Sequence, residues 1–237
     1  MSEHAVDRAE GETITGISSM ATRHLLVELA VAYERESGWR VAIESVGGVD
    51  ALRRIESGET FDFVVLASGA MDKLALAGRI DPASRVDIAR SPVAIAVAAG
   101  APRPDVATEA AVRDAVLAAN SIGYSTGPSG VHLDRLFERW GTADIIASRT
   151  TRAPPGVPVA SLVASGRVEL GFQQLSELMH VPGIDVVGTL PPEIQVVTVF
   201  AGAVCTVSAR HAHARALLSF CASPALAAVK LRHGMTP

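Results

Sequence analysis

Short apolar runs of strand length alternate along the chain with longer amphipathic segments of helix length. Residues 13–17 form the first such run, and in residues 18–37 Leu25, Leu26 and Leu29 recur at helical spacing. The same pattern predicts strands over 40–45, 61–66, 93–98, 121–124, 168–172 and 194–204, and helices over 50–57, 108–119, 131–140, 158–165, 214–221 and 224–232. This order predicts an α/β protein with mostly parallel, right-handed doubly wound sheets flanked by helices.

Two segments, 55–71 and 163–179, follow one template. In each, a helix ends at a Ser-Gly pair (Ser57-Gly58 and Ser165-Gly166), an apolar strand follows, and a Ser and a Met recur at equal offsets. We infer that the chain forms two similar lobes. Two lobes that face each other enclose a cleft, where a ligand is expected to bind.

The long extended runs at 93–98 and 194–204 are expected to cross between the lobes at a hinge. We therefore assign 13–91 and 200–237 to lobe 1, 92–199 with the crossing segments to lobe 2, and 1–12 to a flexible N-terminus. Two extended crossings are typical of proteins that close around a ligand.

Composition narrows the possible functions. The 237 residues are 49% apolar and 19% charged, with a net charge of −4, which does not indicate a nucleic-acid partner. No apolar stretch is long enough to span a bilayer, so we expect no membrane insertion, and we expect a monomer. The start of the chain has no secretory pattern, so as written we expect a cytoplasmic protein, or a periplasmic one if a signal was removed. Cys205 and Cys221 are expected to be buried free thiols.

Small and polar residues gather where the predicted strands lead into helices. Ligands of parallel α/β sheets bind there, because helix N-termini present free backbone N–H groups. Hydroxyls at such positions can instead cap the helix, and Arg152 or the glutamines can be ordinary surface or strand-end residues. The predicted ligand-binding residues are Ser18, Ser19, Met20, Gly47, Gly48, Ser68, the loop Thr126, Gly127, Pro128, Ser129 and Gly130, then Arg152, Gln173 and Gln174.

The sequence has no motif for a nucleotide site, a catalytic serine or a metal site. The chain has no P-loop, no Gly-x-Gly-x-x-Gly fingerprint, no Gly-x-Ser-x-Gly elbow and no metal-ligand spacing among its seven histidines, so no cofactor and no metal are expected. Glu44, His132 and Glu177 could act as general bases, but none has a partner that the sequence can identify. Catalytic residues are therefore left unassigned.

The residues resemble a known family. The helix end Tyr33 to Gly38, the turn Gly47-Gly48, the strand Phe61 to Val65 and the C-terminal Phe220 to Pro224 are similar to type II periplasmic solute-binding proteins, especially the molybdate-binding proteins of ABC importers. The resemblance implies two α/β lobes with two crossover strands, and hinge closure on a small anionic ligand. An ABC permease would be a partner if the protein were exported.

Two departures from the molybdate pattern point to a different ligand. The second turn, Val46-Gly47-Gly48, lacks a hydroxyl, and Gln173-Gln174 stands where that family has a Tyr. Both suit a small organic polycarboxylate better than a tetrahedral oxyanion, although molybdate or tungstate stays an alternative. Aconitate isomerase shares the fold, so a cytoplasmic isomerase that abstracts a proton beside a carboxylate is the other reading.

Overall fold

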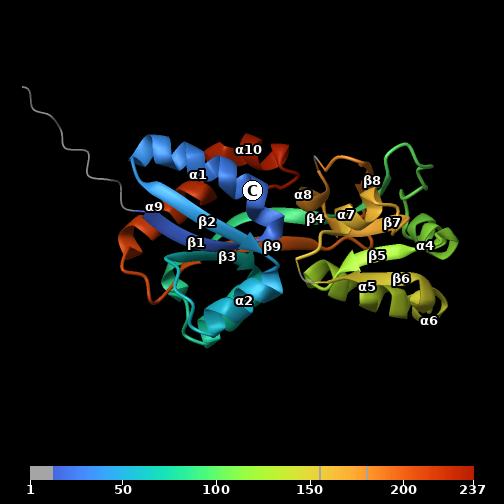
Figure 1. Ribbon diagram of the computed structural model, residues 1–237, viewed down its shortest axis with the longest axis horizontal. Helices are drawn as coiled ribbons and strands as arrows, with labels where there is room; N and C mark the ends of the chain where they lie inside the picture. The colour runs from blue at the N-terminus through green and yellow to red at the C-terminus, as the bar shows by residue number, and fades with distance from the viewer. Residues whose placement is uncertain (1–12, 155, 180) are drawn as a thin grey trace, which may run out of the picture.

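The computed structural model describes residues 13–154, 156–179 and 181–237. The predicted flexible segment 1–12 lies outside these residues. Two α/β lobes lie one beside the other along the long axis of the molecule (Figure 1). The predicted α/β architecture of sheets flanked by helices is present in both lobes.

Lobe 1 is built on strands β1, β2 and β3, which pair in parallel around β1. Its return strand β9 runs antiparallel to β3, and the first half of β4 runs antiparallel to β9. The elements of lobe 1 are β1 (Thr13–Ser19), η1 (Met20–Thr22), α1 (Arg23–Ser37), β2 (Arg40–Val46), α2 (Gly48–Glu56), β3 (Phe63–Ala67), α3 (Ser68–Leu76), η2 (Pro82–Ser84), β9 (Val197–Val204), α9 (His211–Ala222), η4 (Pro224–Leu226) and α10 (Ala227–Arg232).

Lobe 2 is built on β5, which pairs in parallel with both β6 and β7. The second half of β4 lies between β7 and β8, antiparallel to each. The elements of lobe 2 are β4 (Val86–Ala98, shared with lobe 1), α4 (Glu109–Ala118), β5 (Ile122–Ser125), α5 (Pro128–Arg139), α6 (Ala143–Ile146), η3 (Ala147–Arg149), β6 (Thr150–Ala153), α7 (Val159–Ala164), β7 (Leu170–Gln174), α8 (Leu175–Leu178) and β8 (Ile184–Thr189).

The strand β4 joins the lobes. Its residues up to Pro92 pair with β9, whereas from Val93 onward it pairs with β7 and β8. The chain returns through residues 190–196 into β9. The two predicted crossings therefore exist, while the predicted lobe boundaries at 91/92 and 199/200 stay a prediction.

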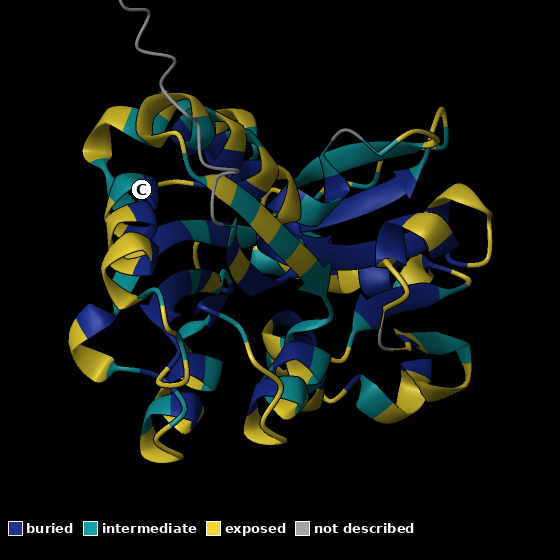
Figure 2. Ribbon diagram, turned by 60° about the vertical axis from the view of Figure 1, so that its left-hand side comes forward, coloured by how far each residue is buried: buried dark blue, intermediate teal, exposed yellow. Residues whose placement is uncertain are grey.

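Each lobe has its own apolar core. In lobe 1 the helices α1 and α9 pack Leu25, Leu29 and Leu217 against Phe63, and in lobe 2 Phe137 and Phe172 meet edge to face at 6.3 Å between centroids. Figure 2 shows the central strands as the buried part of both lobes and the outer helical turns as exposed. Because each lobe buries its own core, the surface between the lobes is not needed to complete a core and can form a cleft.

The Ser-Gly template has a structural cause. Ser57 ends α2 and Ser165 ends α7, and the following Gly58 (φ 94°) and Gly166 (φ 72°) take the left-handed conformation that glycine favours after a helix. The next strands, β3 and β7, occupy corresponding positions in their lobes. The repeat therefore reflects two equivalent helix-turn-strand units.

Several predicted boundaries are wrong. The predicted helix 18–37 begins later, because Ser18 and Ser19 extend β1 along β2, and η1 precedes α1. The predicted loop at Thr126–Gly130 ends early, because Pro128 opens α5, a position that suits its fixed φ. The strands β6 and β8 and the short helices α6 and α8 were not predicted, and α3 was predicted without a range.

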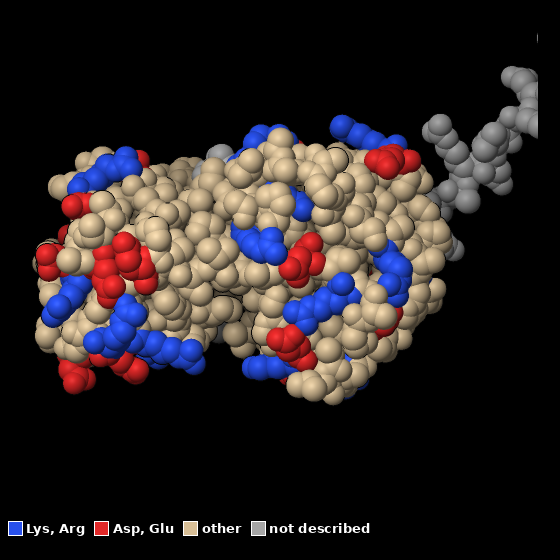
Figure 3. All heavy atoms as spheres, turned by 180° about the vertical axis from the view of Figure 1, so that it is seen from behind, with Lys and Arg blue, Asp and Glu red and all other residues tan. Residues whose placement is uncertain are grey.

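Both cysteines are buried free thiols, as predicted. Among the described residues no single helix is long and apolar enough to cross a membrane. One bent pair of helices, His211–Ala222 with Pro224–Arg232, has a sufficient length and apolar composition when the two are taken together. On the face that Figure 3 shows, basic and acidic side chains are interspersed over both lobes, with a notch between the lobes.

Candidate functional site

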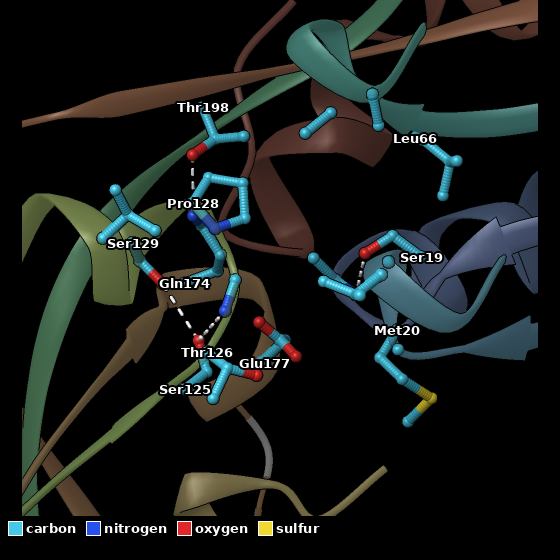
Figure 4. A pocket seen from close by; sticks show the side chains of 18 of the residues that line it. Ser19, Met20, Leu66, Ser125, Thr126, Pro128, Ser129, Gln174, Glu177 and Thr198 are labelled. Atoms are coloured by element: carbon cyan, nitrogen blue, oxygen red, sulfur yellow. Dashed lines mark hydrogen bonds between the residues drawn. The ribbon is translucent and has the colours of Figure 1, made fainter. Parts of the chain in front are cut away.

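A cleft of about 850 Å³ lies between the lobes. Its walls are the first turns of helices from both lobes and the crossing segment Val196–Phe200. Figure 4 shows Ser19 and Met20 on one side of it and Ser125, Thr126 and Gln174 on the other. Across the cleft the lobes come close, because a Cβ at Gly47 would lie 3.6 Å from the Gly156 backbone nitrogen.

Three helices begin at the cleft without a side-chain cap. The N-cap residues of α2, α3 and α5 are Gly47, Ala67 and Gly127, none of which supplies a side-chain acceptor. The first backbone N–H groups of these helices are thus left for a ligand, in a region where the helix dipole favours negative charge. The missing hydroxyl at the second turn, noted in the sequence, is part of this arrangement.

The cleft hydroxyls have mixed roles. Ser19 caps η1, since its Oγ accepts from the Ala21 N–H at 3.3 Å, and Ser68 donates to the Val199 carbonyl at 3.2 Å. Ser125 and Ser129 share a hydrogen bond of 3.3 Å at the start of α5. The last pair can turn toward a ligand, because two hydroxyls bonded to each other each keep further bonding capacity.

The two glutamines point their amides in different directions. The Gln173 Nε2 donates to Glu177 Oε1 at 2.8 Å, and its Oε1 accepts from the Ala160 N–H at 3.3 Å. The Gln174 Nε2 donates to Thr198 Oγ1 at 2.7 Å, while its Oε1 is buried without a hydrogen-bond partner among the described residues. A buried, unsatisfied amide oxygen in a ligand cleft is costly, and it marks a place where a ligand can complete the bonding.

Glu177 brings an ionisable group to the cleft. It lies on α8, four residues after Gln173, and its carboxyl group is grouped with Ser125 and Thr126 in Figure 4. Burial of this side chain raises its pKa to about 7, and the hydrogen bond from Gln173 opposes that rise. Near neutral pH the carboxyl group is therefore divided between its acid and base forms, as a proton-transfer residue requires.

Most of the residues predicted from sequence line the cleft: Ser19, Met20, Gly47, Gly48, Ser68, Thr126, Gly127, Pro128, Ser129, Gln173 and Gln174. Three other predicted residues, Ser18, Gly130 and Arg152, do not line the cleft. Ser18 is fully buried and bonds Ser45 at 2.9 Å, and a Cβ at Gly130 would lie 1.7 Å from the Ser125 carbonyl oxygen, so these two residues serve packing.

Arg152 is the third exception. Its guanidinium donates to Asp134 at 2.7 Å and lies over the Tyr124 ring, in a separate hollow on lobe 2. The Arg152 guanidinium, which was expected to bind a ligand carboxylate, is already paired with Asp134. The expectation of Arg152 in the cleft is therefore wrong.

Two of the general-base candidates also lie elsewhere. Glu44 pairs with Arg54 on the surface of lobe 1, and His132 Nε2 is 2.8 Å from the Ile194 carbonyl. Lys73 and Arg135 line the cleft but were not singled out from the sequence. The helix of Arg135 was predicted over 131–140, whereas no range was predicted for the helix of Lys73. The helical spacing from Val131 to Arg135 and from Gly69 to Lys73 was the signal that could have found them.

Comparison with known proteins shows the family to which the chain belongs. Residues 14–236 match the model of the family described as bacterial extracellular solute-binding proteins. The chain belongs to this family.

A curated relative in sequence is an aconitate isomerase of Pseudomonas sp., 37% identical over 230 residues, which cover 95% of this chain and 88% of the relative. Solved structures of other binding proteins also align with this chain. The periplasmic molybdate-binding protein of Azotobacter vinelandii aligns with a TM-score of 0.79 at 20% identity, over 94% of this chain and 99% of that one. The sulfate-binding protein of Mycobacterium tuberculosis aligns with a TM-score of 0.73 at 16% identity, over 95% and 87%. At these identities the structures support the fold alone, and they confirm the predicted two-lobed type II binding-protein fold.

Proposed function

We propose that the protein binds a small polycarboxylate in the interlobe cleft and isomerises it by proton transfer through Glu177. The single observation that carries the enzyme reading is Glu177 itself, a cleft carboxyl group with a pKa of about 7. The 37% identity to an aconitate isomerase supports the same reading.

The chemistry needs one base and an anion site. In an acid of the aconitate type, a CH2 group and a C=C bond share a carbon atom that bears a carboxylate. Glu177 as carboxylate takes a proton from the CH2 carbon. The electron pair of that C–H bond forms a new C=C bond to the shared carbon, and the electron pair of the old C=C bond moves to the far carbon. The carboxyl group of Glu177 then returns the proton to that far carbon. One proton leaves and one is added, so no oxidant or reductant takes part.

The uncapped helix N-termini have a role in the same step. Negative charge develops on a substrate carboxylate when the proton leaves, and fixed backbone N–H donors at α3 and α5 stabilise such charge without reorganising. Since Glu177 and the helix starts line one cleft, the base and the anion site act on the same molecule.

The experiment is proton NMR of cis- and trans-aconitate in deuterated buffer. We expect the wild-type protein to interconvert the isomers, with deuterium in the CH2 position to the extent that the proton held by Glu177 exchanges with solvent before its return. We expect Glu177→Gln to lose about a hundredfold or more in rate. Glu138→Gln, on exposed surface outside the cleft, is the matched control and keeps the wild-type rate. Wild-type rates in Glu177→Gln would refute the role of Glu177.

Ligand binding without turnover is the second candidate, and membership in a solute-binding family favours it. A thermal-shift screen with molybdate, tungstate, sulfate and di- and tricarboxylates tests the ligand class, since a ligand of the folded state raises its melting temperature. Stabilisation by a tricarboxylate without isomerisation would assign binding alone. In that case an ABC permease is the partner of an exported form.

A further inference from the structure

Two cations line the cleft, one from each lobe. Lys73 belongs to α3 of lobe 1 and Arg135 to α5 of lobe 2. Both side chains are exposed, and within the described part of the chain neither makes a hydrogen bond or an ion pair. Asp50, an acidic neighbour on the same cleft, is already paired with Arg53. The positive charges of Lys73 and Arg135 are therefore free to meet an anion.

Helix geometry aims both side chains along the cleft walls. Lys73 follows Gly69 by four residues, and Arg135 follows Val131 by four and Pro128 by seven, all of which line the cleft. Residues at these spacings share one helical face. Each cation thus belongs to its own wall, and its backbone lies beyond the helix start, about 7 Å along α3 for Lys73 and about 10 Å along α5 for Arg135 at about 1.5 Å of rise per residue.

A polycarboxylate supplies negative charge both to the helix starts and to the two cations farther along the helices. One carboxylate satisfies the N–H donors at the helix starts, and a second or third remains toward the cations. We propose that Lys73 and Arg135 form a charge-counting pair, which binds the outer carboxylates and makes affinity rise with the number of carboxylates on the ligand. This inference rests on the proposed carboxylate ligand but not on its turnover.

The position of the pair on opposite lobes gives it a second effect. A ligand that contacts both cations links the two walls, so its binding energy favours the closed arrangement. Closure would also cover the exposed valines that line the cleft, which are Val49, Val131, Val157 and Val197. Displacing water from this rim strengthens the charge contacts, because the local dielectric falls.

The test is calorimetric titration with three saturated acids that cannot isomerise: propane-1,2,3-tricarboxylate, glutarate and butyrate. We expect Lys73→Gln and Arg135→Gln each to weaken tricarboxylate binding about fivefold or more and to leave butyrate binding within twofold. The salt dependence of tricarboxylate binding should also fall in both variants. Arg35→Gln and Arg113→Gln, which remove exposed charges outside the cleft of each lobe, are the controls and should bind all three acids as the wild type does.

Equal affinities of wild type and variants for the tricarboxylate would overturn the proposal, as would an equal loss for all three acids. A wild type that binds no tricarboxylate overturns both the pair and the carboxylate ligand. A wild type that binds the tricarboxylate in this way but does not convert aconitate leaves the pair supported and removes only the isomerase. Lys73 lies in the last turn of α3, where a cation also favours the helix; that role alone would lower the melting temperature without changing the ratio of the three affinities.

Discussion

The Gln173 side-chain amide donates a 2.8 Å hydrogen bond to the Glu177 carboxyl group. The orientation of this amide is held from behind, because the Ala160 backbone N–H donates to its carbonyl oxygen at 3.3 Å. The NH2 group therefore faces Glu177 and stabilises the ionised carboxylate, opposing the burial that raises its pKa. Gln173 is a positioning residue that acts through Glu177.

Replacement of Gln173 should move the pH dependence of the proposed activity. In Gln173→Met the donor is lost, so the Glu177 pKa rises and its base form appears only at higher pH. A hydrogen bond to a charged group contributes about 1.5 kcal/mol or more, and about 1.4 kcal/mol corresponds to one pH unit. The acidic limb of kcat/KM for aconitate is expected about one pH unit higher. A lower rate with an unmoved acidic limb would mean that Gln173 serves only packing.

The raised pKa of Glu177 also predicts how stability depends on pH. The folded protein binds the proton more tightly than the unfolded chain, whose Glu titrates near 4.5, so folding stability falls as pH rises from 4.5 through about 7. The span of about 2.5 units, at about 1.4 kcal/mol each, sets an upper limit of about 3.5 kcal/mol.

Urea unfolding at pH 5 and pH 8 measures this effect. Between these values the wild type should lose more unfolding free energy than Glu177→Gln, which has no such titration, and Glu138→Gln should behave as the wild type does. The same pH dependence in wild type and Glu177→Gln would show that Glu177 titrates normally in the folded protein.

Gln174 is expected to reverse its amide when an anion binds. Its Nε2 donates to the Thr198 hydroxyl, and its Oε1 has no partner in the part of the chain that the structure describes. A hydroxyl can donate as well as accept, so a turned amide keeps the Thr198 bond through Oε1 and presents NH2 to a carboxylate. We expect Gln174→Leu to weaken tricarboxylate binding about tenfold, with little change in unfolding free energy, because the variant also removes the unsatisfied oxygen.

Thr198→Val is the companion variant, since it removes the hydroxyl that holds the amide. It should weaken binding less than Gln174→Leu does, because the amide itself remains. Titration calorimetry and urea unfolding give both quantities. Unchanged affinity in Gln174→Leu would show that this side chain does not contact the ligand.

The fold could be predicted because its signals are local. The Ser57-Gly58 and Ser165-Gly166 pairs end helices in the conformation that glycine favours, and the apolar run at Phe63–Ala67 has the length and composition of a buried strand. β6 has only four residues, three of them polar or charged, and its strand pairing depends on β5, so no local pattern indicated it.

The site was predictable only in part, for the same reason. Ser19 and Gly47 meet because the parallel strands β1 and β2 share a carboxyl edge, and Thr126, at the end of β5 in the other lobe, lines the same cleft. Which polar group is already satisfied is a tertiary property: Asp134 lies 18 residues before Arg152 and takes its guanidinium away from the cleft. The pKa of Glu177 likewise depends on the atoms that surround it in three dimensions.

Gly127 and Gly130 lie three residues apart in the predicted ligand loop, and the structure separates their roles. A Cβ at Gly130 would lie 1.7 Å from the Ser125 carbonyl oxygen, whereas at Gly127, with φ at −78°, the nearest atom is Ser125 Oγ at 3.6 Å. Gly130→Ala must push β5 away from α5, and we expect it to lower the unfolding free energy by about 3 kcal/mol. Gly127→Ala should cost within about 1 kcal/mol, the usual range for an N-cap change, yet weaken tricarboxylate binding, because its methyl group enters the cleft beside Ser125. Urea unfolding and calorimetry on both variants test this, and a Gly130→Ala protein of wild-type stability would show that α5 does not need this close approach to β5.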